Sequence, residues 1–328
     1  SSRRRHTRYG TVTGVQTCAL PILQTFIEEG SPHFRLREDR ALNQLHWGST
    51  RQGEWPNVLA FAFDHRSQLE ALCEDPAKIS QFKTLCAEVT TDAINRHPNQ
   101  QLGVLCDHRL GQEALFKMAE HPLWMASPVE LPSSRPLKFE GGPSLATMLK
   151  EWPKHTVVKC LCFTHPDDDD ALWAEQSASL LALFTVTRSL GLELLLEFIP
   201  PADMPRTETT IARSMAMTYE LGIYPDWWKL PAPKNDAWDA EWAAWQQVIE
   251  KYDPHCRGVL LLGLAAPQDD VKTSITRASQ QPLCKGFAVG RTIFGDAASQ
   301  WFQGQISDSE AKTLMARSFD DLISAWRS

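Results

Sequence analysis

A lysine near the end of a short aromatic stretch is the first residue in this sequence that suggests chemistry. Lys229 lies in Tyr224-Pro225-Asp226-Trp227-Trp228-Lys229-Leu230-Pro231, which is typical of a buried strand bounded by prolines. Lysine is rarely buried without a partner. A neutral lysine amine in an apolar site near a second cation can attack a carbonyl and form a Schiff base. The alternative is an ordinary strand-end lysine whose ammonium reaches solvent.

Other ionisable residues stand at or just beyond the ends of apolar runs. In chain order they are Asp64, Arg66, Asp107, Arg109, Glu130, Lys159, Glu197 and Arg291. Period-two alternation puts Lys159 on the face of Leu161, Glu197 on that of Leu195, and Lys229 on that of Trp227. These phases allow the side chains to point into one space. Each residue taken alone is explained as well by a salt bridge at the rim of the fold.

The elements that would position these residues are short apolar runs alternating with longer amphipathic stretches, a pattern typical of repeated βα units. The predicted strands are Val58–Asp64, Leu102–Asp107, Trp124–Glu130, Thr156–Thr164, Leu192–Ile199, Trp227–Ala232, Gly258–Gly263 and Gly286–Ile293. About eight such units in roughly 270 residues match a (β/α)8 barrel. An open doubly wound sheet is the alternative, but it usually has a glycine-rich turn after its first strand, and Phe63-Asp64-His65-Arg66 has none. We therefore predict an α/β fold, a single (β/α)8 TIM barrel over residues 55–328.

The barrel gives the charged residues a common location, because barrel enzymes carry their chemistry at the C-terminal ends of the strands. Two lysines and several carboxylates would then surround one cavity, where a carboxylate such as Glu197 can move protons. Loops after strands seven and eight often bind phosphate. Gly263, Gly290 and Arg291 stand at those positions, and we predict that they bind phosphate. Plain turn chemistry is the alternative for the glycines.

Composition argues against several other classes of protein. The 328 residues carry a net charge of −7, and no Lys/Arg-rich run lies beyond the first eight residues, so we expect no nucleic-acid partner. No apolar stretch approaches the roughly 20 residues of a membrane span. The eight cysteines form no CxxC pair and the strand ends carry no histidine cluster. We therefore expect reduced thiols, a cytoplasmic location and no metal or other cofactor.

The N-terminal part of the chain differs from the rest. Residues 1–22 have no usable periodicity and resemble translated adapter or vector sequence, so we expect a longer native N-terminus. Residues 23–54 are charged and mixed, and we interpret them as a linker leading into the barrel. Short helices are expected near Leu23–Glu29 and Leu36–Leu45, and Gly48–Gly53 is expected to be a loop.

Several segments resemble the C-terminal aldolase domain of the bacterial bifunctional 5-dehydro-2-deoxygluconokinase/5-dehydro-2-deoxyphosphogluconate aldolase of myo-inositol catabolism. They are Phe61–Arg66, Gly103–Asp107, Val158–Asp168, Leu195–Glu197, Pro225–Leu230 and Gly286–Thr292. The resemblance runs from about residue 23 to the end. More distantly, the domain is similar to the metal-independent class I tagatose-bisphosphate aldolases. The resemblance to the bifunctional enzyme implies a fused N-terminal sugar kinase in the native protein.

The resemblance also implies residue roles. Lys229 matches the Schiff-base lysine, Glu197 the acid/base glutamate and Lys159 an assisting lysine. Asp64 and Arg66 match an Asp-x-Arg on the first strand. The implied reaction is retro-aldol cleavage of 6-phospho-5-dehydro-2-deoxy-D-gluconate, a phosphorylated keto-sugar acid, to dihydroxyacetone phosphate and malonate semialdehyde.

Substrate binding would fall to residues after other strands. Arg291 and nearby backbone N–H groups would hold the phosphate, and Arg66 or Arg109 would meet the substrate carboxylate. Asp107 is a further substrate-binding candidate. Two other functions stay open: a non-catalytic sugar-phosphate-binding domain of the fused kinase, and a class I aldolase for another ketose phosphate. The sequence also leaves open whether the protein forms a homo-oligomer.

Overall fold

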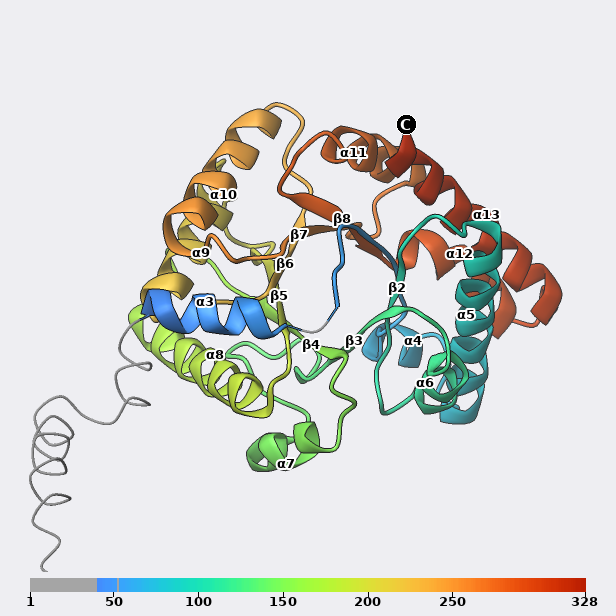
Figure 1. The fold of residues 1–328 in the computed structure, drawn as a ribbon. Helices are drawn as coiled ribbons and strands as arrows, with labels where there is room; N and C mark the ends of the chain where they lie inside the picture. Colours follow the sequence, from blue (N-terminus) through green and yellow to red (C-terminus); the bar gives the residue numbers. More distant parts are fainter. Residues whose placement is uncertain (1–39, 52) are drawn as a thin grey trace, which may run out of the picture. The chain divides into compact units, whose positions relative to one another are not determined.

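A computed structural model of the protein describes residues 40–51 and 53–328 (Figure 1). It divides into two units, residues 1–51 and 52–328, which are considered separately. In the first unit the described helix is α3, Arg40–Thr50. This helix passes through Gly48, where we expected a loop; a single glycine costs a helix only about 1 kcal/mol. The adapter-like residues 1–22 and the expected helix at Leu23–Glu29 lie outside the described residues.

The second unit is a closed barrel of eight parallel strands in chain order, which confirms the predicted (β/α)8 fold. The strands are β1 (Val58–Ala62), β2 (Leu102–Leu105), β3 (Trp124–Pro128), β4 (Thr156–Phe163), β5 (Leu194–Ile199), β6 (Trp227–Pro231), β7 (Gly258–Leu262) and β8 (Cys284–Val289). Figure 1 shows the helices arranged around the outside of these strands.

Helices follow each of the strands along the chain, and α12 and α13 come after the last one. They are α4 (Ser67–Glu70), α5 (Pro76–Arg96), α6 (Gln112–Met118), the 3-10 turn η1 (Gly142–Ser144), α7 (Leu145–Lys150), α8 (Asp170–Leu190), α9 (Thr210–Glu220), α10 (Trp238–Tyr252), α11 (Gln268–Ala278), α12 (Arg291–Phe302) and α13 (Asp308–Arg327). The amphipathic stretch between the first two strands is divided into two helices, α4 and α5. The second part begins at Pro76, and the Asp75 side chain caps it by accepting the Ala77 N–H at 2.9 Å. The last predicted strand also ends early, because α12 begins at Arg291.

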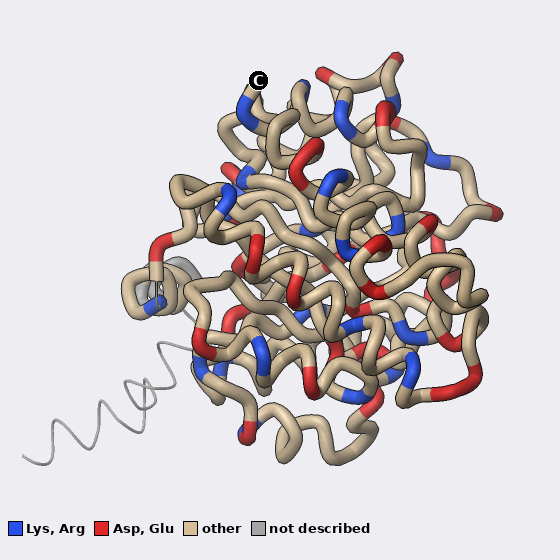
Figure 2. The backbone as a smooth tube through the Cα atoms, turned by 90° about the vertical axis from the view of Figure 1, so that its right-hand side faces the viewer, with Lys and Arg blue, Asp and Glu red and all other residues tan. Residues whose placement is uncertain are grey.

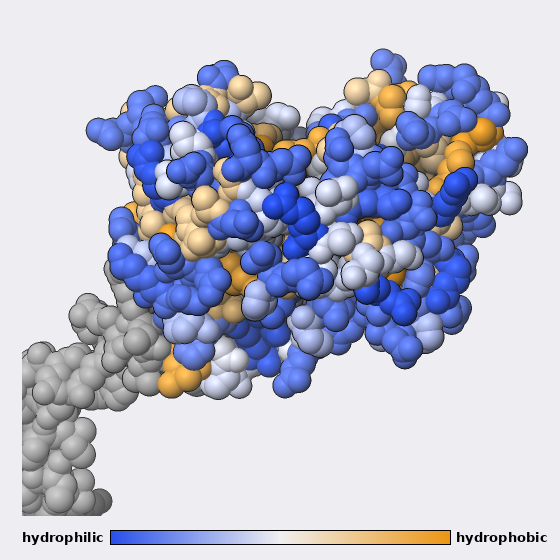
Figure 3. All heavy atoms as spheres, turned by 90° about the horizontal axis from the view of Figure 1, so that it is seen from above, coloured by the Kyte–Doolittle hydropathy of each residue, from blue (hydrophilic) through white to orange (hydrophobic). Residues whose placement is uncertain are grey.

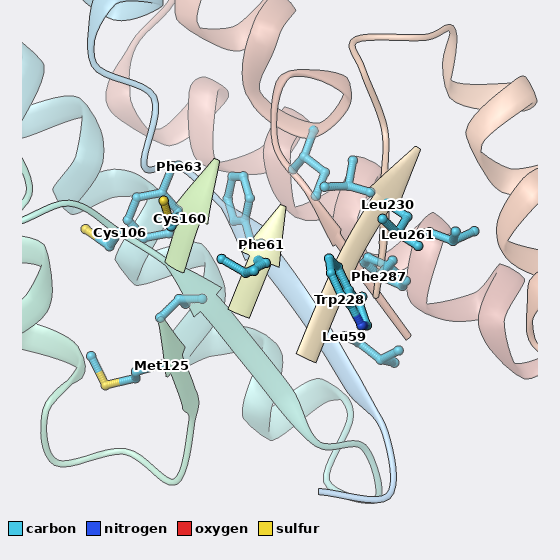
Figure 4. Packing of buried hydrophobic residues seen from close by; sticks show 14 of the residues in the cluster. Leu59, Phe61, Phe63, Cys106, Met125, Cys160, Trp228, Leu230, Leu261 and Phe287 are labelled. Atoms are coloured by element: carbon cyan, nitrogen blue, oxygen red, sulfur yellow. The ribbon is translucent and has the colours of Figure 1, made fainter. Parts of the chain in front are cut away.

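Two apolar layers hold the barrel together. Inside it lies a cluster made of Val58, Ala60, Ala62, Leu105, Trp124, Ala126, Val157, Leu195, Trp227, Leu260 and Ala288. The opposite faces of the same strands pack beneath the helices, as the labelled residues Phe61, Trp228 and Phe287 do in Figure 4. The interior assignment confirms the predicted strand phases, because the alternating partners of the charged residues point inward.

The seam between β1 and β8 closes the barrel through a glycine. Val58 lies opposite Gly286 in the parallel register. Gly286 has a φ of 134°, and a Cβ there would lie 1.9 Å from the Val58 carbonyl oxygen. Only glycine tolerates both this backbone conformation and this approach.

The surface of the barrel unit carries both signs of charge. In Figure 2 Lys and Arg are interspersed with Asp and Glu along the chain. The face seen in Figure 3 is mostly hydrophilic, with hydrophobic side chains in small scattered groups. Among the described helices none has the length and apolar character needed to span a membrane.

Candidate active site

A cavity of about 210 Å³ lies at the C-terminal ends of the strands. Its walls include most of the residues predicted for the site, namely Asp64, Arg66, Lys159, Glu197, Lys229, Gly263, Gly290 and Arg291. Asp107 and Arg109 are not among its lining residues. His65 and Glu130 line it as well.

Lys229 is buried at the cavity and faces a carboxylate. It is 5% exposed, and its Nζ lies 3.1 Å from Glu197 Oε1. The β5–β6 pairing brings them together, because Glu197 stands directly opposite Lys229 in the register. Lys229 is therefore not a strand-end lysine whose ammonium reaches solvent. It is a buried lysine with a carboxylate partner.

Lys159 is surrounded by three carboxylates. Its Nζ lies 3.2 Å from Asp64 Oδ2, 2.9 Å from Glu130 Oε1 and 2.9 Å from Glu197 Oε2. Burial alone would lower the pKa of Lys159, but these three carboxylates together raise that pKa well above its usual value. Lys159 is therefore a fixed ammonium.

The two lysines in turn hold Glu197 and Asp64 in their ionised forms. Burial opposes ionisation of Glu197, yet Lys159 and Lys229 lower the pKa of this carboxyl below its usual value. Burial also opposes ionisation of Asp64, and the same two lysines hold the pKa of Asp64 far below its normal range. Glu197 is thus a carboxylate that touches two lysines, one with each oxygen.

Glu130 links this cluster to Arg66. In the sequence, Glu130 stands at the end of an apolar run, and we predicted no role for it. Arg66 Nη2 donates to Glu130 Oε1 at 2.7 Å, and Arg66 Nη1 donates to the Glu130 carbonyl at 3.0 Å. The second carboxylate oxygen accepts the Leu161 N–H at 3.1 Å. Glu130 therefore fixes Arg66 and Lys159 at once.

Arg66 and Arg109, both predicted to bind substrate, meet at Glu140. Arg66 Nη1 lies 3.2 Å from Glu140 Oε1, so both amino groups of Arg66 already have carboxylate or carbonyl partners. Arg109 is nearly half exposed and pairs with Glu70 at 2.6 Å, with Glu140 3.7 Å from its Nε. The structure thus brings Arg66 to the cavity and keeps Arg109 outside it.

Asp107 does not reach the cavity either. It is fully buried, and it pairs with Lys83 while accepting the Leu110 N–H at 2.8 Å. Alternation along the second strand would have pointed Asp107 inward with Leu105. However, β2 ends at Leu105, and beyond that end the Asp107 carboxylate pairs with Lys83 and does not enter the cavity.

The loops after β7 and β8 form another part of the cavity wall. After Gly263, Leu264 and Ala265 adopt the left-handed region, with φ of 48° and 57°. Gly290 has no room for a side chain, since a Cβ would lie 2.3 Å from the Ala62 carbonyl oxygen and 2.4 Å from His65 Cε1. Arg291 begins α12 and is exposed, so its guanidinium and the helix N-terminus are available to an anion.

His65 lies in the same wall and is uncharged at neutral pH. Burial lowers the pKa of His65 to about 4, with Lys229 and Arg291 acting in the same direction against Asp64. No group of three or more His, Cys, Asp or Glu suited to a metal occurs within residues 40–51 and 53–328.

A family described as "Uncharacterized protein conserved in bacteria (DUF2090)" has a model that matches residues 22–328. The chain belongs to the DUF2090 family. A comparison with curated proteins finds no match to this DUF2090 chain.

Solved structures resemble this DUF2090 protein in fold. Fructose-bisphosphate aldolase from Plasmodium falciparum matches with a TM-score of 0.60 at 12% identity, covering 88% of this chain and 95% of that one. Cgl0159 from Corynebacterium glutamicum matches with a TM-score of 0.55 at 17% identity, covering 88% of this chain and 97% of that one. At these identities the likeness concerns the fold.

Proposed function

We propose that this DUF2090 protein is a class I aldolase in which Lys229 forms a Schiff base with a phosphorylated ketose. One observation carries the proposal: the buried Lys229 Nζ lies 3.1 Å from the buried Glu197 Oε1, at a cavity on the C-terminal side of the barrel. A carboxylate at this distance can accept the proton that a lysine must lose before it attacks a carbonyl. The fold shared with a fructose-bisphosphate aldolase agrees with this chemistry.

Imine formation requires two proton transfers that Glu197 is close enough to perform. Glu197 accepts a proton from the Lys229 ammonium, and the neutral amine attacks the ketone carbon. The same carboxyl returns that proton to the carbinolamine hydroxyl, which leaves as water. The result is an iminium on Lys229 and a Glu197 that is again a carboxylate.

The iminium then accepts the electrons of the breaking carbon–carbon bond. In the proposed substrate, 6-phospho-5-dehydro-2-deoxy-D-gluconate, the ketone is C5 and the bond that breaks is C3–C4. Glu197 takes the proton of the C3 hydroxyl, malonate semialdehyde leaves, and an enamine stays on Lys229. Glu197 protonates the enamine at C4, and water hydrolyses the new iminium to release dihydroxyacetone phosphate.

Asp64 and Lys159 support these steps electrostatically. The Lys159 ammonium, 2.9 Å from Glu197 Oε2, keeps Glu197 ionised and ready to accept a proton. Asp64 interacts favourably with the positive charge at Lys229, and an iminium carries the same charge. Both effects are strong because the cluster is buried.

Phosphate binding is proposed for Arg291 and the N–H groups that begin α12, beside Gly263 and Gly290. A guanidinium and a helix N-terminus favour a phosphate group. The substrate carboxylate is not assigned to Arg66, whose amino groups contact Glu130 and Glu140, or to Arg109, which lies outside the cavity.

Borohydride trapping tests the proposal. Treatment with dihydroxyacetone phosphate and borohydride should leave a reduced adduct on Lys229, found by peptide mass spectrometry. The K229M variant should form none, whereas K272M, which removes a surface lysine of α11, should form it normally. Trapping without cleavage of 6-phospho-5-dehydro-2-deoxy-D-gluconate would reject this substrate and keep the aldolase chemistry. No adduct, with activity abolished by a chelator, would reject the Schiff-base mechanism.

A further inference from the structure

A fully buried lysine beside the cavity takes no part in the chemistry proposed above. Lys83 lies on α5 and is 0% exposed. It is not among the cavity-lining residues, so it does not reach a substrate. A buried ammonium is stable only when its protons are all hydrogen-bonded, and its partners therefore identify what it holds in place.

The partners of Lys83 lie at the ends of two neighbouring strands. Its Nζ donates to the Phe63 carbonyl at 2.8 Å, to the His65 carbonyl at 3.0 Å and to the carboxylate of Asp107. These three contacts use the three protons of an ammonium. The other oxygen of Asp107 accepts the Leu110 N–H at 2.8 Å, which fixes the chain after β2.

Two of these acceptors flank Asp64. The β1 strand ends at Ala62, and the Phe63 N–H still donates to the Leu105 carbonyl at 2.8 Å. Beyond that point, contacts from Lys83 take the place of strand pairing on both sides of Asp64. With the carbonyls of residues 63 and 65 held, the backbone of Asp64 has little freedom to rotate. From this backbone position the Asp64 carboxylate lies 3.2 Å from Lys159 Nζ.

We propose that Lys83, supported by Asp107, is a positioning residue that holds the end of β1 so that the Asp64 carboxylate faces Lys159. Its catalytic consequence rests on the proposed aldolase function, whereas its geometric consequence does not. The competing view is that Lys83 and Asp107 neutralise each other and contribute only to stability.

The test uses a variant that removes both buried charges together. K83M alone would leave Asp107 buried without its cation, which endangers folding. K83M/D107N avoids this, because asparagine keeps an oxygen to accept the Leu110 N–H. A crystal structure of K83M/D107N should show the Asp64 carboxylate turned away from Lys159, with the barrel otherwise unchanged. If Asp64 stays in contact with Lys159, the proposal is wrong whatever the protein catalyses.

Kinetics give a second, independent arm in the form of a mutant cycle with D64N. K83M/D107N should lower kcat about tenfold or more, with little change in KM, since substrate contacts are untouched. In the D64N background the same pair should cost less than about twofold, because its effect passes through Asp64. If the kcat losses of K83M/D107N and of D64N multiply in full when the variants are combined, the proposal is wrong. Absence of any adduct in the wild type would instead count against the aldolase function and leave the crystallographic arm decisive.

An ion pair with a fully buried aspartate at the other end of the barrel is the control; the side chain of its cation, Arg188, is 18% exposed. Arg188 Nη1 lies 2.8 Å from Asp226 Oδ2, and the same fully buried carboxylate accepts the Leu194 N–H at 2.8 Å. Asp226 precedes β6 at its N-terminal end, away from the cavity. R188M/D226N should lower stability and leave kcat unchanged. An equal loss of kcat in this control would show that the effect of K83M/D107N is merely structural.

Discussion

Replacing Lys159 by methionine tests whether a single ammonium holds the buried charge cluster together. Asp64, Glu130 and Glu197 all contact it, and Arg66 and Lys229 supply the other two positive charges. With Lys159 these six groups are neutral together, and without it three carboxylates face two cations; a further carboxylate, Glu140, is shared between Arg66 and Arg109. Each contact, at 2.9 to 3.2 Å, corresponds to an attraction of roughly 5 to 6 kcal/mol at an effective dielectric constant of about 20.

Desolvation of the ammonium offsets much of that attraction, so the expected net loss is smaller. Breaking a buried ion pair by removing one partner typically costs about 3–5 kcal/mol. We expect K159M to lose about this much free energy of unfolding at pH 7. Urea unfolding followed by tryptophan fluorescence measures it. K312M is the matched control, because Lys312 pairs with Glu88 at the surface and should cost about 0–1 kcal/mol.

The free energy of unfolding that K159M loses relative to the wild type should become smaller as the pH falls. In the wild type the folded-state pKa values of Asp64 and Glu197 are depressed, so their stabilisation is full above the unfolded-state values and falls away only in acid. Without Lys159 these pKa values rise, and the folded variant takes up a proton more readily than the unfolded chain. The deficit of K159M should therefore shrink between pH 7 and pH 5. Adding E130Q, which removes one carboxylate charge, should shrink it at pH 7. A deficit below about 1 kcal/mol, or one unchanged by pH and by E130Q, would refute this reasoning.

Two further predictions concern catalysis. E197Q should lower kcat by about 10²–10⁴, the usual share of a general acid–base group, in a steady-state cleavage assay. An activity within about threefold of the wild type would exclude Glu197 as the proton carrier. R291Q should weaken binding of the phosphorylated substrate by about 10–100-fold, since a hydrogen bond to a charged group contributes about 1.5–3 kcal/mol. Isothermal titration with inorganic phosphate checks this, and equal affinity in both proteins would place the phosphate elsewhere.

The sequence predicted the barrel and the inward direction of its charged residues for a definable reason. Alternation decides the direction of a side chain while the residue lies within a strand. Lys159, Glu197 and Lys229 lie inside β4, β5 and β6, and each reaches the cavity as expected. Asp107 and Arg109 lie beyond the end of β2, where their ion-pair partners decide direction: Asp107 pairs with Lys83, and Arg109 pairs with Glu70. Their predicted position at the cavity therefore fails.

Other parts of the site could not be anticipated from strand ends. Glu130 was visible in the sequence, but its contacts with Lys159 and Arg66 depend on how strands far apart in the chain meet. Lys83 carried one overlooked signal. It stands four residues after Ile79 and three before Cys86, so it lies on the apolar face of its helix. Because lysine is rarely buried without a partner, a lysine on the apolar face of a helix predicts a buried partner.

The seam at Gly286 has a consequence for how this protein acquires activity. Lys229 and Glu197 belong to the half of the barrel from β5 to β8, whereas Asp64, Glu130 and Lys159 belong to or follow strands of the half from β1 to β4. Neither half alone contains the complete cluster. Under the proposed function, the return of activity during refolding reports that both junctions between the halves, β4–β5 and β8–β1, have formed. The rate at which substrate cleavage returns would thus measure the rate of barrel closure. Separately expressed halves would be active only after they associate.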